Sequence, residues 1–375
     1  MQVRLLRAAG HRVDLHRPGP LLRPGVRSVP VPLRQVRVAL PFTPPPADIV
    51  HAQTTGPIGI TGFRAAAAWR VPLVVTWHTD LLAYADLFAE IPIGAAWCAL
   101  RLEVGWSARE YLELTRPGRV RRLRLESLGR AMFARMAVAV APSAKTAAGF
   151  AAFSPAASIR VLPTPVATVH PPSPPAPSSP PLLPPLPGPA RRDVVLSVGR
   201  GTAEKNPELL LQAFARVRAA RPGARLVLVG VQQQRRRLLR RIAALGLGGH
   251  VEVHPPVPHE QVTGFYRAAG VLAFTSTTDT QSLVLAEAEA AGLPVVVVDR
   301  GLMTRPGETG GARFACDPAP DALASALLRM LDDDTLRAAT IRDGLAAAAA
   351  YTPEVFLNRL LAIYELALSV RARSS

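Results

Sequence analysis

The chain has 375 residues, of which 49% are hydrophobic, and it carries 44 Lys and Arg against 27 Asp and Glu, a net charge of +17. This apolar content excludes a disordered chain, and two cysteines exclude a disulfide scaffold or a Cys-based zinc site. The start lacks the apolar segment of a secretory signal, and no apolar run reaches the ~18 residues that span a bilayer. We therefore expect a cytoplasmic protein, with peripheral attachment to the inner face of the membrane as the alternative to a fully soluble state.

The positive charge is unevenly distributed along the chain. Residues 1–170 carry 21 basic and 9 acidic groups, whereas residues 171–375 carry 23 and 18. Only Lys145 and Lys205 are lysines, so a coding bias toward arginine is one explanation of the surplus. The other is an anionic partner, a membrane surface or a nucleic acid, that faces the first half of the chain.

The first segment, LRAAGHRVDLHRP, predicts the last turn of a helix, a stop at Gly10 and a strand over Val13–Leu15. A doubly wound domain ordinarily opens with a strand and a tight turn before such a helix. The first domain is therefore predicted to lack its opening strand, and we expect in-frame upstream sequence to encode it.

Short Val- and Leu-rich runs then alternate with helical stretches, which predicts buried parallel sheets built from βαβ units. The predicted strands lie in DIVHAQ, PLVVTWH, AVAVAPS and IRVLP, and later in DVVLSVG, ARLVLVG, HVEVHP, GVLAFTS and LPVVVVD. Ligands of such sheets bind at the carboxyl ends of the strands.

A proline-rich segment separates the two series of strands. Of the 19 residues from Pro171 to Pro189, 11 are proline, which favours an extended spacer; an SH3-type ligand is the functional alternative. The predicted organisation is an N-terminal domain over 1–167, a linker over 168–190, a C-terminal domain over 191–352 and a final helix over 353–375, with packing of that helix back on the first domain as one option.

The segment SVGRGTAEKNPELLLQAF places two cations beside a helix start. A turn begins at Gly199, and a helix is predicted from Pro207 with Asn206 as its cap, so Arg200 and Lys205 lie in a loop at the carboxyl edge of the sheet. Two cations and free backbone N–H groups suit a diphosphate. The alternative is a solvated loop with ordinary charges.

The segment TSTTDTQSLVLAEAEAAGLPVVVVD carries two acids at a second helix start. Asp279 lies at the mouth of the helix and Glu287 about two turns inside it. The N–H groups of residues 281–284, which include Ser282 and Leu283, are predicted to meet anionic oxygens. A carboxylate deeper in the helix can accept the hydroxyls of a ribose, although acids near a helix start are also common as caps and surface groups.

In the first domain, VPLVVTWHTDLLAYAD places His78 and Asp80 just after a buried strand. That position suits cleft residues, with His78 as a catalytic and Asp80 as a binding candidate, against a purely structural histidine as the alternative. His51 occupies an equivalent strand end and is a weaker candidate.

Taken together, these segments resemble glycosyltransferase family 4, the retaining nucleotide-sugar transferases of GT-B fold. The segments that carry the resemblance are DIVHAQTTGPIGI, VVTWHTDLLAY, VAPSAKTAAGF with IRVLPTPV, SVGRGTAEKNPELLLQAF, and TDTQSLVLAEAEAAGLPVVVVD. The TWHTD and TDTQ segments are most similar to the branch that modifies lipids.

The resemblance implies a role for each matching residue. Arg200 and Lys205 match the pair that neutralises the donor diphosphate, and Glu287 matches the acid that holds the ribose. Asp279 matches the acid, normally glutamate, that touches the donor sugar, and His78 matches the histidine over the anomeric carbon.

Three further positions belong to the donor site that the resemblance implies. Gly199 and Gly230 lie in the turns that follow two strands of the second domain. Ser282 replaces a family glycine beside the donor, but its N–H is retained, so diphosphate binding at this helix start is still expected.

For the whole chain, the resemblance implies an α/β protein of GT-B fold with two Rossmann-like doubly wound domains facing across a cleft. It implies a retaining transfer of a hexose from a nucleotide-diphosphate sugar to a lipid or other hydrophobic acceptor, with no metal and no cofactor. A catalytically weak relative that binds a nucleotide or a partner is the alternative, because the family's opening strand and glycine-rich loop are missing.

A basic helix is predicted in the first domain. Residues 116–135 contain seven Arg and one Glu, with Arg121, Arg122 and Arg124 near the helix start. A basic amphipathic helix is typical of an anionic membrane surface on the acceptor side. A buried helix with solvated arginines is the alternative.

Two other classes of function find little support. Aromatic residues make up 5% of the chain and are not interleaved with a basic stripe, so we expect no nucleic-acid partner. A dehydrogenase requires G-x-G-x-x-G after its first strand, and no strand here is followed by that motif.

Overall fold

The structure, a computed structural model, describes residues 1–16, 47–150, 153, 159–166, 191–303 and 312–372. These residues form two compact units, one of residues 1–164 with 353–375 and the other of residues 165–352. The predicted linker over 168–190 lies outside the described residues.

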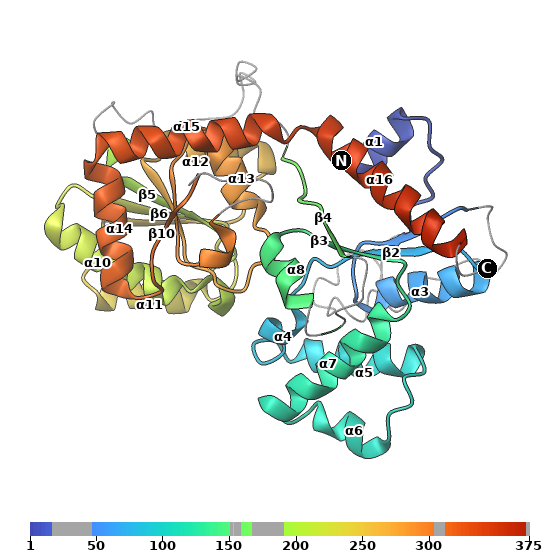
Figure 1. Ribbon diagram of the computed structural model, residues 1–375. Coiled ribbons are helices and arrows are strands. Elements are labelled where there is room, and N and C mark those ends of the chain that lie inside the picture. Colours follow the sequence, from blue (N-terminus) through green and yellow to red (C-terminus); the bar gives the residue numbers. More distant parts are fainter. Residues whose placement is uncertain (17–46, 151–152, 154–158, 167–190, 304–311, 373–375) are drawn as a thin grey trace. The chain divides into compact units, whose positions relative to one another are not determined.

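The first unit is built on a four-stranded parallel sheet in the order β1-β2-β3-β4 (Figure 1). Its strands are β1 (Val50–Ala52), β2 (Leu73–Thr76), β3 (Val138–Ala141) and β4 (Ile159–Val161). Its helices are α1 (Gln2–Ala8), α3 (Pro57–Trp69), α4 (Leu81–Tyr84), α5 (Glu90–Arg101), α6 (Ala108–Glu113), α7 (Arg119–Phe133), α8 (Ala144–Phe150) and α16 (Pro353–Ala372).

One apolar cluster fills the space between this sheet and helices α3, α5, α7 and α8. β2 and β3 are buried along their whole length, as expected for central parallel strands covered on both faces. Within the cluster, Phe153 stacks on Trp77 and Phe133, and Phe150 packs against the same two rings at steeper angles. Helix α16, which is more than 190 residues away in the sequence, packs on β2 and β3 and on α1.

The start of the chain corrects one prediction. Helix α1 ends at Ala8, and Gly10 follows with φ +87°, as the expected stop requires. The described residues 11–16, however, contain no strand, so the strand predicted over Val13–Leu15 is wrong. The carbonyl of Val13 accepts a hydrogen bond from the Arg7 guanidinium, and Leu15 is exposed, so this segment is held by a side chain.

The second unit contains a six-stranded parallel sheet in the order β10-β9-β8-β5-β6-β7 (Figure 1). Its strands are β5 (Val194–Val198), β6 (Arg225–Val229), β7 (Val251–His254), β8 (Val271–Phe274), β9 (Val295–Val297) and β10 (Phe314–Ala315). Its helices are η1 (Ala203–Lys205), α10 (Pro207–Ala220), α11 (Arg235–Ala244), α12 (His259–Ala268), α13 (Leu283–Ala290), η2 (Arg300–Leu302), α14 (Pro320–Asp332) and α15 (Asp334–Ala350).

Helices cover both faces of this sheet. Alternate strand residues face opposite sides, and one set packs against α10, α11 and α14 while the other packs against α12 and α13. Helix α15 packs in turn on α13. This three-layer arrangement is the doubly wound fold that the alternating strands and helices predict.

All nine strands predicted from DIVHAQ onward are present, and β10 is an additional one that the sequence did not indicate because it has only two residues. The strand order reverses between β5 and β8, since the chain moves outward from β5 through β6 to β7 and then returns on the other side of β5 with β8. Such a switch point is where doubly wound sheets bind ligands. Within the described residues, no helix has both the length and the apolar character needed to cross a membrane.

Candidate active site

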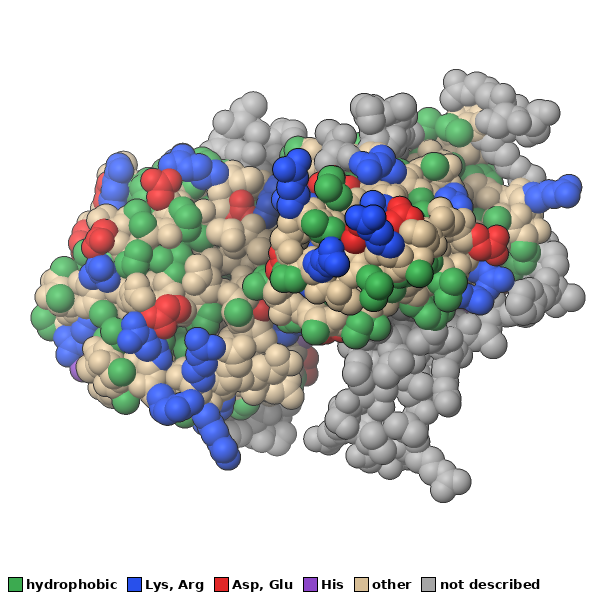
Figure 2. Space-filling view, turned by 90° about the horizontal axis from the view of Figure 1, so that it is seen from below, with side chains coloured by type: hydrophobic (Ala, Val, Ile, Leu, Met, Phe, Trp, Pro, Cys, Tyr) green, Lys and Arg blue, Asp and Glu red, His purple; other side chains and the backbone are tan. Residues whose placement is uncertain are grey.

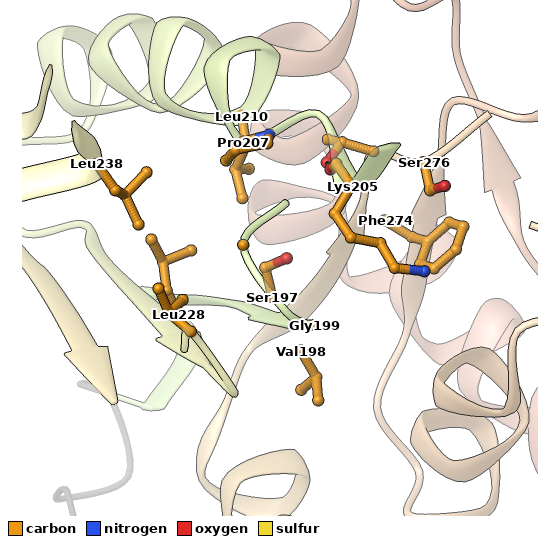
Figure 3. Close-up of a pocket in the computed structure, with 13 residues that line it drawn as sticks. Ser197, Val198, Gly199, Lys205, Pro207, Leu210, Leu228, Leu238, Phe274 and Ser276 are labelled. Carbon is orange, nitrogen blue, oxygen red and sulfur yellow. Dashed lines mark hydrogen bonds between the residues drawn. The ribbon is translucent and has the colours of Figure 1, made fainter. Parts of the chain in front are cut away.

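A pocket lies at the switch point of the second unit (Figure 3). The polar part of its lining follows the carboxyl ends of β5 and β8 and includes Ser197, Gly199, Lys205, Thr275 and Ser276. The apolar part comes from α10, α11, β6 and the loop that follows β6. Its polar groups therefore lie where the topology predicts a ligand.

Lys205 is the cation of this pocket. Its Nζ lies 2.7 and 2.8 Å from the two carboxylate oxygens of Asp279 and 5.9 Å from the centre of the Phe274 ring, toward which the side chain extends in Figure 3. The backbone carbonyl of Lys205 accepts a hydrogen bond of 2.7 Å from Thr275 Oγ1. Thr275 thus connects η1 to the end of β8. Lys205 and Asp279 are 74 residues apart in the sequence, and the structure brings these two predicted donor-site residues into contact.

Arg200 is held by a buried acid. Its guanidinium donates to Glu204 Oε1 at 2.8 Å, and the side chain of Arg200 is 60% exposed whereas that of Glu204 is fully buried. Thr202 Oγ1 donates to the same oxygen. A buried carboxylate that orients an exposed guanidinium leaves the outer face of Arg200 available to an anion.

Gly199 and Gly230 are in close contact. The Gly199 N–H donates to Val229 O at 2.8 Å, and Gly230 has φ +93°. A Cβ on Gly230 would lie 3.0 Å from the Gly199 carbonyl oxygen. The two turns after β5 and β6 can therefore approach this closely only with glycine at position 230.

Ser282 is the N-cap of α13 and has φ 57° and ψ 100°. Serine stands here in a conformation that favours glycine, which costs about 1–3 kcal/mol at a non-glycine residue. Leu283 begins the helix, and its side chain is exposed.

Glu287 lies in α13 with a mostly buried side chain. Its Oε2 accepts a hydrogen bond of 2.8 Å from the Tyr266 hydroxyl of α12, and its Oε1 lies 3.8 Å from His259 Nε2. Tyr266 and His259 are absent from the sequence predictions because nothing in the sequence links α12 to α13.

Other residues that the sequence analysis missed are polar groups directly after β8. Thr275 and Ser276 are 3% and 1% exposed, although both are polar. Two hydroxyl residues at the carboxyl end of a fully apolar strand are the signal that would have indicated them.

His78 lies after β2 in the first unit and is exposed. Its Nε2 is 3.4 Å from Gln53 Oε1, and the Gln53 amide nitrogen is 3.1 Å from His51 Nε2. His51 also contacts the hydroxyls of Thr76 and Tyr364, each at 2.8 Å. The structure therefore connects His78 through Gln53 to a polar cluster between β1, β2 and α16.

His51 makes the first unit sensitive to acid. Burial lowers the pKa of His51 to about 3, and the neighbouring His78 ring adds to the effect. The unfolded chain binds this proton below about 6.5 and the folded one only near 3, so the free energy of unfolding falls, by at most about 1.4 kcal/mol per pH unit, as the pH drops through that window.

We expect wild-type protein to lose more stability between pH 7 and 4 than the His51→Gln variant. All four tryptophans (Trp69, Trp77, Trp97 and Trp106) lie in the first unit, so urea titrations followed by tryptophan fluorescence report on it selectively. Equal losses in the two proteins would contradict a neutral buried His51.

Asp80 and the arginines of α7 have structural partners. Asp80 caps α4, since its Oδ1 accepts from the backbone N–H groups of Leu82 and Ala83. Arg121 pairs with Asp86 and is mostly buried. Arg122 pairs with Glu126, and Arg124 pairs with Glu110 and Glu113.

Basic side chains do not form one continuous patch in Figure 2, where they alternate with acidic and hydrophobic ones. Among the residues that the structure describes, no group of three His, Cys, Asp or Glu side chains is placed to hold a metal ion.

Comparison with known families divides the chain into two parts, close to the boundary between the two structural units. Residues 2–170 match the family described as Glycosyltransferase Family 4, and residues 184–345 match the family described as Glycosyl transferases group 1.

Among curated relatives, a D-inositol 3-phosphate glycosyltransferase of Acidothermus cellulolyticus is 36% identical over 190 residues, which cover 48% of this chain and 42% of that protein. A D-inositol 3-phosphate glycosyltransferase 1 of Catenulispora acidiphila is 35% identical over 188 residues, 47% of this chain and 44% of that protein. The match thus spans less than half the length of these relatives.

Two solved structures show the same fold. Anabaena HepE in complex with UDP-glucose has a TM-score of 0.61 and 20% identity, covering 84% of this chain and 77% of that one. Sucrose-phosphate synthase of Thermosynechococcus elongatus has a TM-score of 0.60 and 21% identity, covering 85% and 73%. With its two parallel sheets in Rossmann-like units, the chain therefore has the GT-B fold, and its two halves are similar to the Glycosyltransferase Family 4 and the Glycosyl transferases group 1 families.

Proposed function

We propose that the protein is a glycosyltransferase that moves a hexose from a nucleotide-diphosphate sugar to an alcohol acceptor. The observation that carries the proposal is Lys205 in the pocket at the switch point of the second unit, with Arg200 in the same loop and Asp279 on its ammonium. The cations would neutralise the leaving diphosphate. The HepE structure in complex with UDP-glucose makes a uridine nucleotide the first donor to test.

The remaining roles follow from this placement. The diphosphate would compete with Asp279 for the Lys205 ammonium, since both carboxylate oxygens of Asp279 contact this ammonium. Asp279 would then be free to accept from a sugar hydroxyl. Glu287 would accept from the ribose, and the N–H groups at Ser282 and Leu283 would meet phosphate oxygens.

We propose that transfer retains the anomeric configuration and needs no metal, with His78 over the sugar. Arg, Lys and the N–H groups at a helix start are preorganised donors that would stabilise the negative charge of the leaving diphosphate in place of a metal ion. Nuclear magnetic resonance of the product would give its anomeric configuration. We expect the rate of transfer to be the same with and without EDTA, because no metal takes part.

The acceptor has two candidates. A lipid or other hydrophobic alcohol is what the resemblance to the lipid-modifying branch suggests, whereas the names of the curated relatives favour D-inositol 3-phosphate. The test is incubation with UDP-, GDP- and dTDP-hexoses together with each acceptor, followed by mass spectrometry. Binding of a nucleotide without transfer to either acceptor class would favour the weak relative that only binds.

For membrane contact, helix α5 offers a better surface than α7. Ile93 and Leu100 are 68% and 64% exposed and lie two turns apart on one face, with Trp97 between them. The Arg101 guanidinium lies 5.7 Å from the Trp97 ring centre. We propose that this α5 stripe (Ile93, Trp97, Leu100 and Arg101) contacts an anionic bilayer.

We expect Ile93→Ser with Leu100→Ser to weaken binding to phosphatidylglycerol vesicles at least tenfold, because two apolar side chains no longer enter the interface. Salt should weaken the binding of the wild type. The control is Leu239→Ser with Leu345→Ser, two leucines of the second unit that are 40% and 43% exposed. Equal vesicle binding by the two double variants would contradict the α5 stripe.

A further inference from the structure

The two carboxylate oxygens of Glu287 have different partners. Tyr266 donates its hydroxyl hydrogen to Oε2 at 2.8 Å from the neighbouring helix α12. Tyr266 is 1% exposed and packs in the apolar cluster between the sheet and helices α12 and α13, so its ring has no room to move away.

Tyr266 is also locked as a donor. Burial raises the pKa of Tyr266 well above its usual value, and the Glu287 carboxylate raises it further through its charge and the hydrogen bond. The phenol therefore stays protonated at any working pH, and its hydrogen is always available to Oε2.

The other oxygen of Glu287 has a more distant and exposed partner. Oε1 lies 3.8 Å from Nε2 of His259, whose side chain is 76% exposed at the start of α12. An exposed imidazole can turn away when a ligand arrives, whereas a buried tyrosine cannot. The two oxygens are thus unequal, one committed to the protein and one open to a ligand.

We infer that Tyr266 is a positioning residue that fixes the Glu287 carboxylate so that Oε1 accepts a ribose hydroxyl, which makes Tyr266 a determinant of selectivity for ribonucleoside diphosphates. The inference rests on the proposed function, because it takes Glu287 as the ribose-binding acid. It adds a residue of α12, which lies outside every sequence motif of the donor site.

The test compares the affinities for UDP and for 2′,3′-dideoxy-UDP, measured by calorimetry on the full chain. Hydrogen bonds to a charged group contribute about 1.5–3 kcal/mol, so we expect wild type to prefer UDP by at least tenfold. In Glu287→Gln this preference should nearly vanish. In Tyr266→Phe it should fall by about tenfold, because the carboxylate is then free to rotate.

A matched variant separates positioning from packing. Phe265 is the neighbour of Tyr266 in α12, is 2% exposed and lies in the same cluster. Phe265→Leu should lower the melting temperature at least as much as Tyr266→Phe and leave the preference for UDP unchanged.

Each result has one reading. A normal preference in Tyr266→Phe, together with its loss in Glu287→Gln, overturns the role of Tyr266 and leaves the proposed function standing. An undiminished preference in Glu287→Gln removes Glu287 from the ribose site and overturns the inference with it. If wild type binds no UDP or other nucleoside diphosphate, the proposed function itself is wrong.

Discussion

Replacing Lys205 by Ala should lower kcat/KM for the sugar donor on the order of 10²-fold, the loss typical of removing one preorganised stabilising group from a charged transition state. Lys205 supplies the ammonium of the pocket; Asp279 and the Phe274 ring contact this ammonium, and Thr275 fixes the backbone of Lys205 through its carbonyl. The Lys205 ammonium is therefore already in position before the donor binds.

The design of this experiment uses the rarity of lysine in the chain. Lys145, the only other lysine, lies in α8 of the first unit, and Lys145→Ala is the matched control. Lys205→Arg should retain more activity than Lys205→Ala because the positive charge remains. Steady-state rates and UDP affinity would be measured together, with far-ultraviolet circular dichroism to check folding.

Asp279→Asn separates the two members of the ion pair. Without the competing carboxylate, Lys205 should bind UDP at least as tightly as in wild type, whereas sugar transfer should fall. A fully active Lys205→Ala variant, or a strict requirement for a divalent ion, would contradict the assignment of the diphosphate to Lys205.

Replacing Arg313 by Met should destabilise the second unit by about 3–5 kcal/mol, since it leaves a buried carboxylate without its cation. Arg313 and Glu289 are 5% and 1% exposed, and the guanidinium contacts both Glu289 oxygens, at 2.5 and 3.2 Å. It also donates to the Leu302 carbonyl. Glu289 lies in α13, so this pair anchors the helix that carries Glu287.

Urea titrations can assign the loss to one unit. Circular dichroism follows both units, whereas tryptophan fluorescence follows only the first, so Arg313→Met should shift the former signal and leave the latter unchanged. Arg342→Met, which removes an exposed pair with Asp343, is the control and should change stability by less than about 1 kcal/mol.

A double variant completes the test. Glu289→Leu combined with Arg313→Met should regain part of the lost stability, because no unpaired buried charge remains. A single Arg313→Met variant within about 1 kcal/mol of wild type would show that Glu289 has sufficient other partners.

The amino-acid sequence by itself determined the fold class and most of the strands. Runs such as VAVA and VLAF are apolar at every position, and only a central parallel strand covered on both faces buries them all. Local chemistry also determined the start of α10, where Asn206 caps the Leu209 N–H and Pro207 begins the helix. These features depend on neighbours in the chain, so they can be predicted from the sequence.

Local pattern was misleading where pairing partners matter. Val13–Leu15 has the alternation of a strand, but in the described residues it forms no strand, because a β-strand needs a neighbouring strand with which to hydrogen-bond. Likewise, Arg121 and Arg124 read as free surface cations, and the structure places acids of other elements beside them.

Only the tertiary structure decided which side chains come together in the proposed donor site. Lys205 and Asp279 are 74 residues apart, and Tyr266 and Glu287 belong to different helices. They meet because the sheet reverses its strand order between β5 and β8 and because α12 and α13 cover the same face. A hydrogen bond acts over about 3 Å in space whatever the separation along the chain, so these partnerships become visible only once the sheet is assembled.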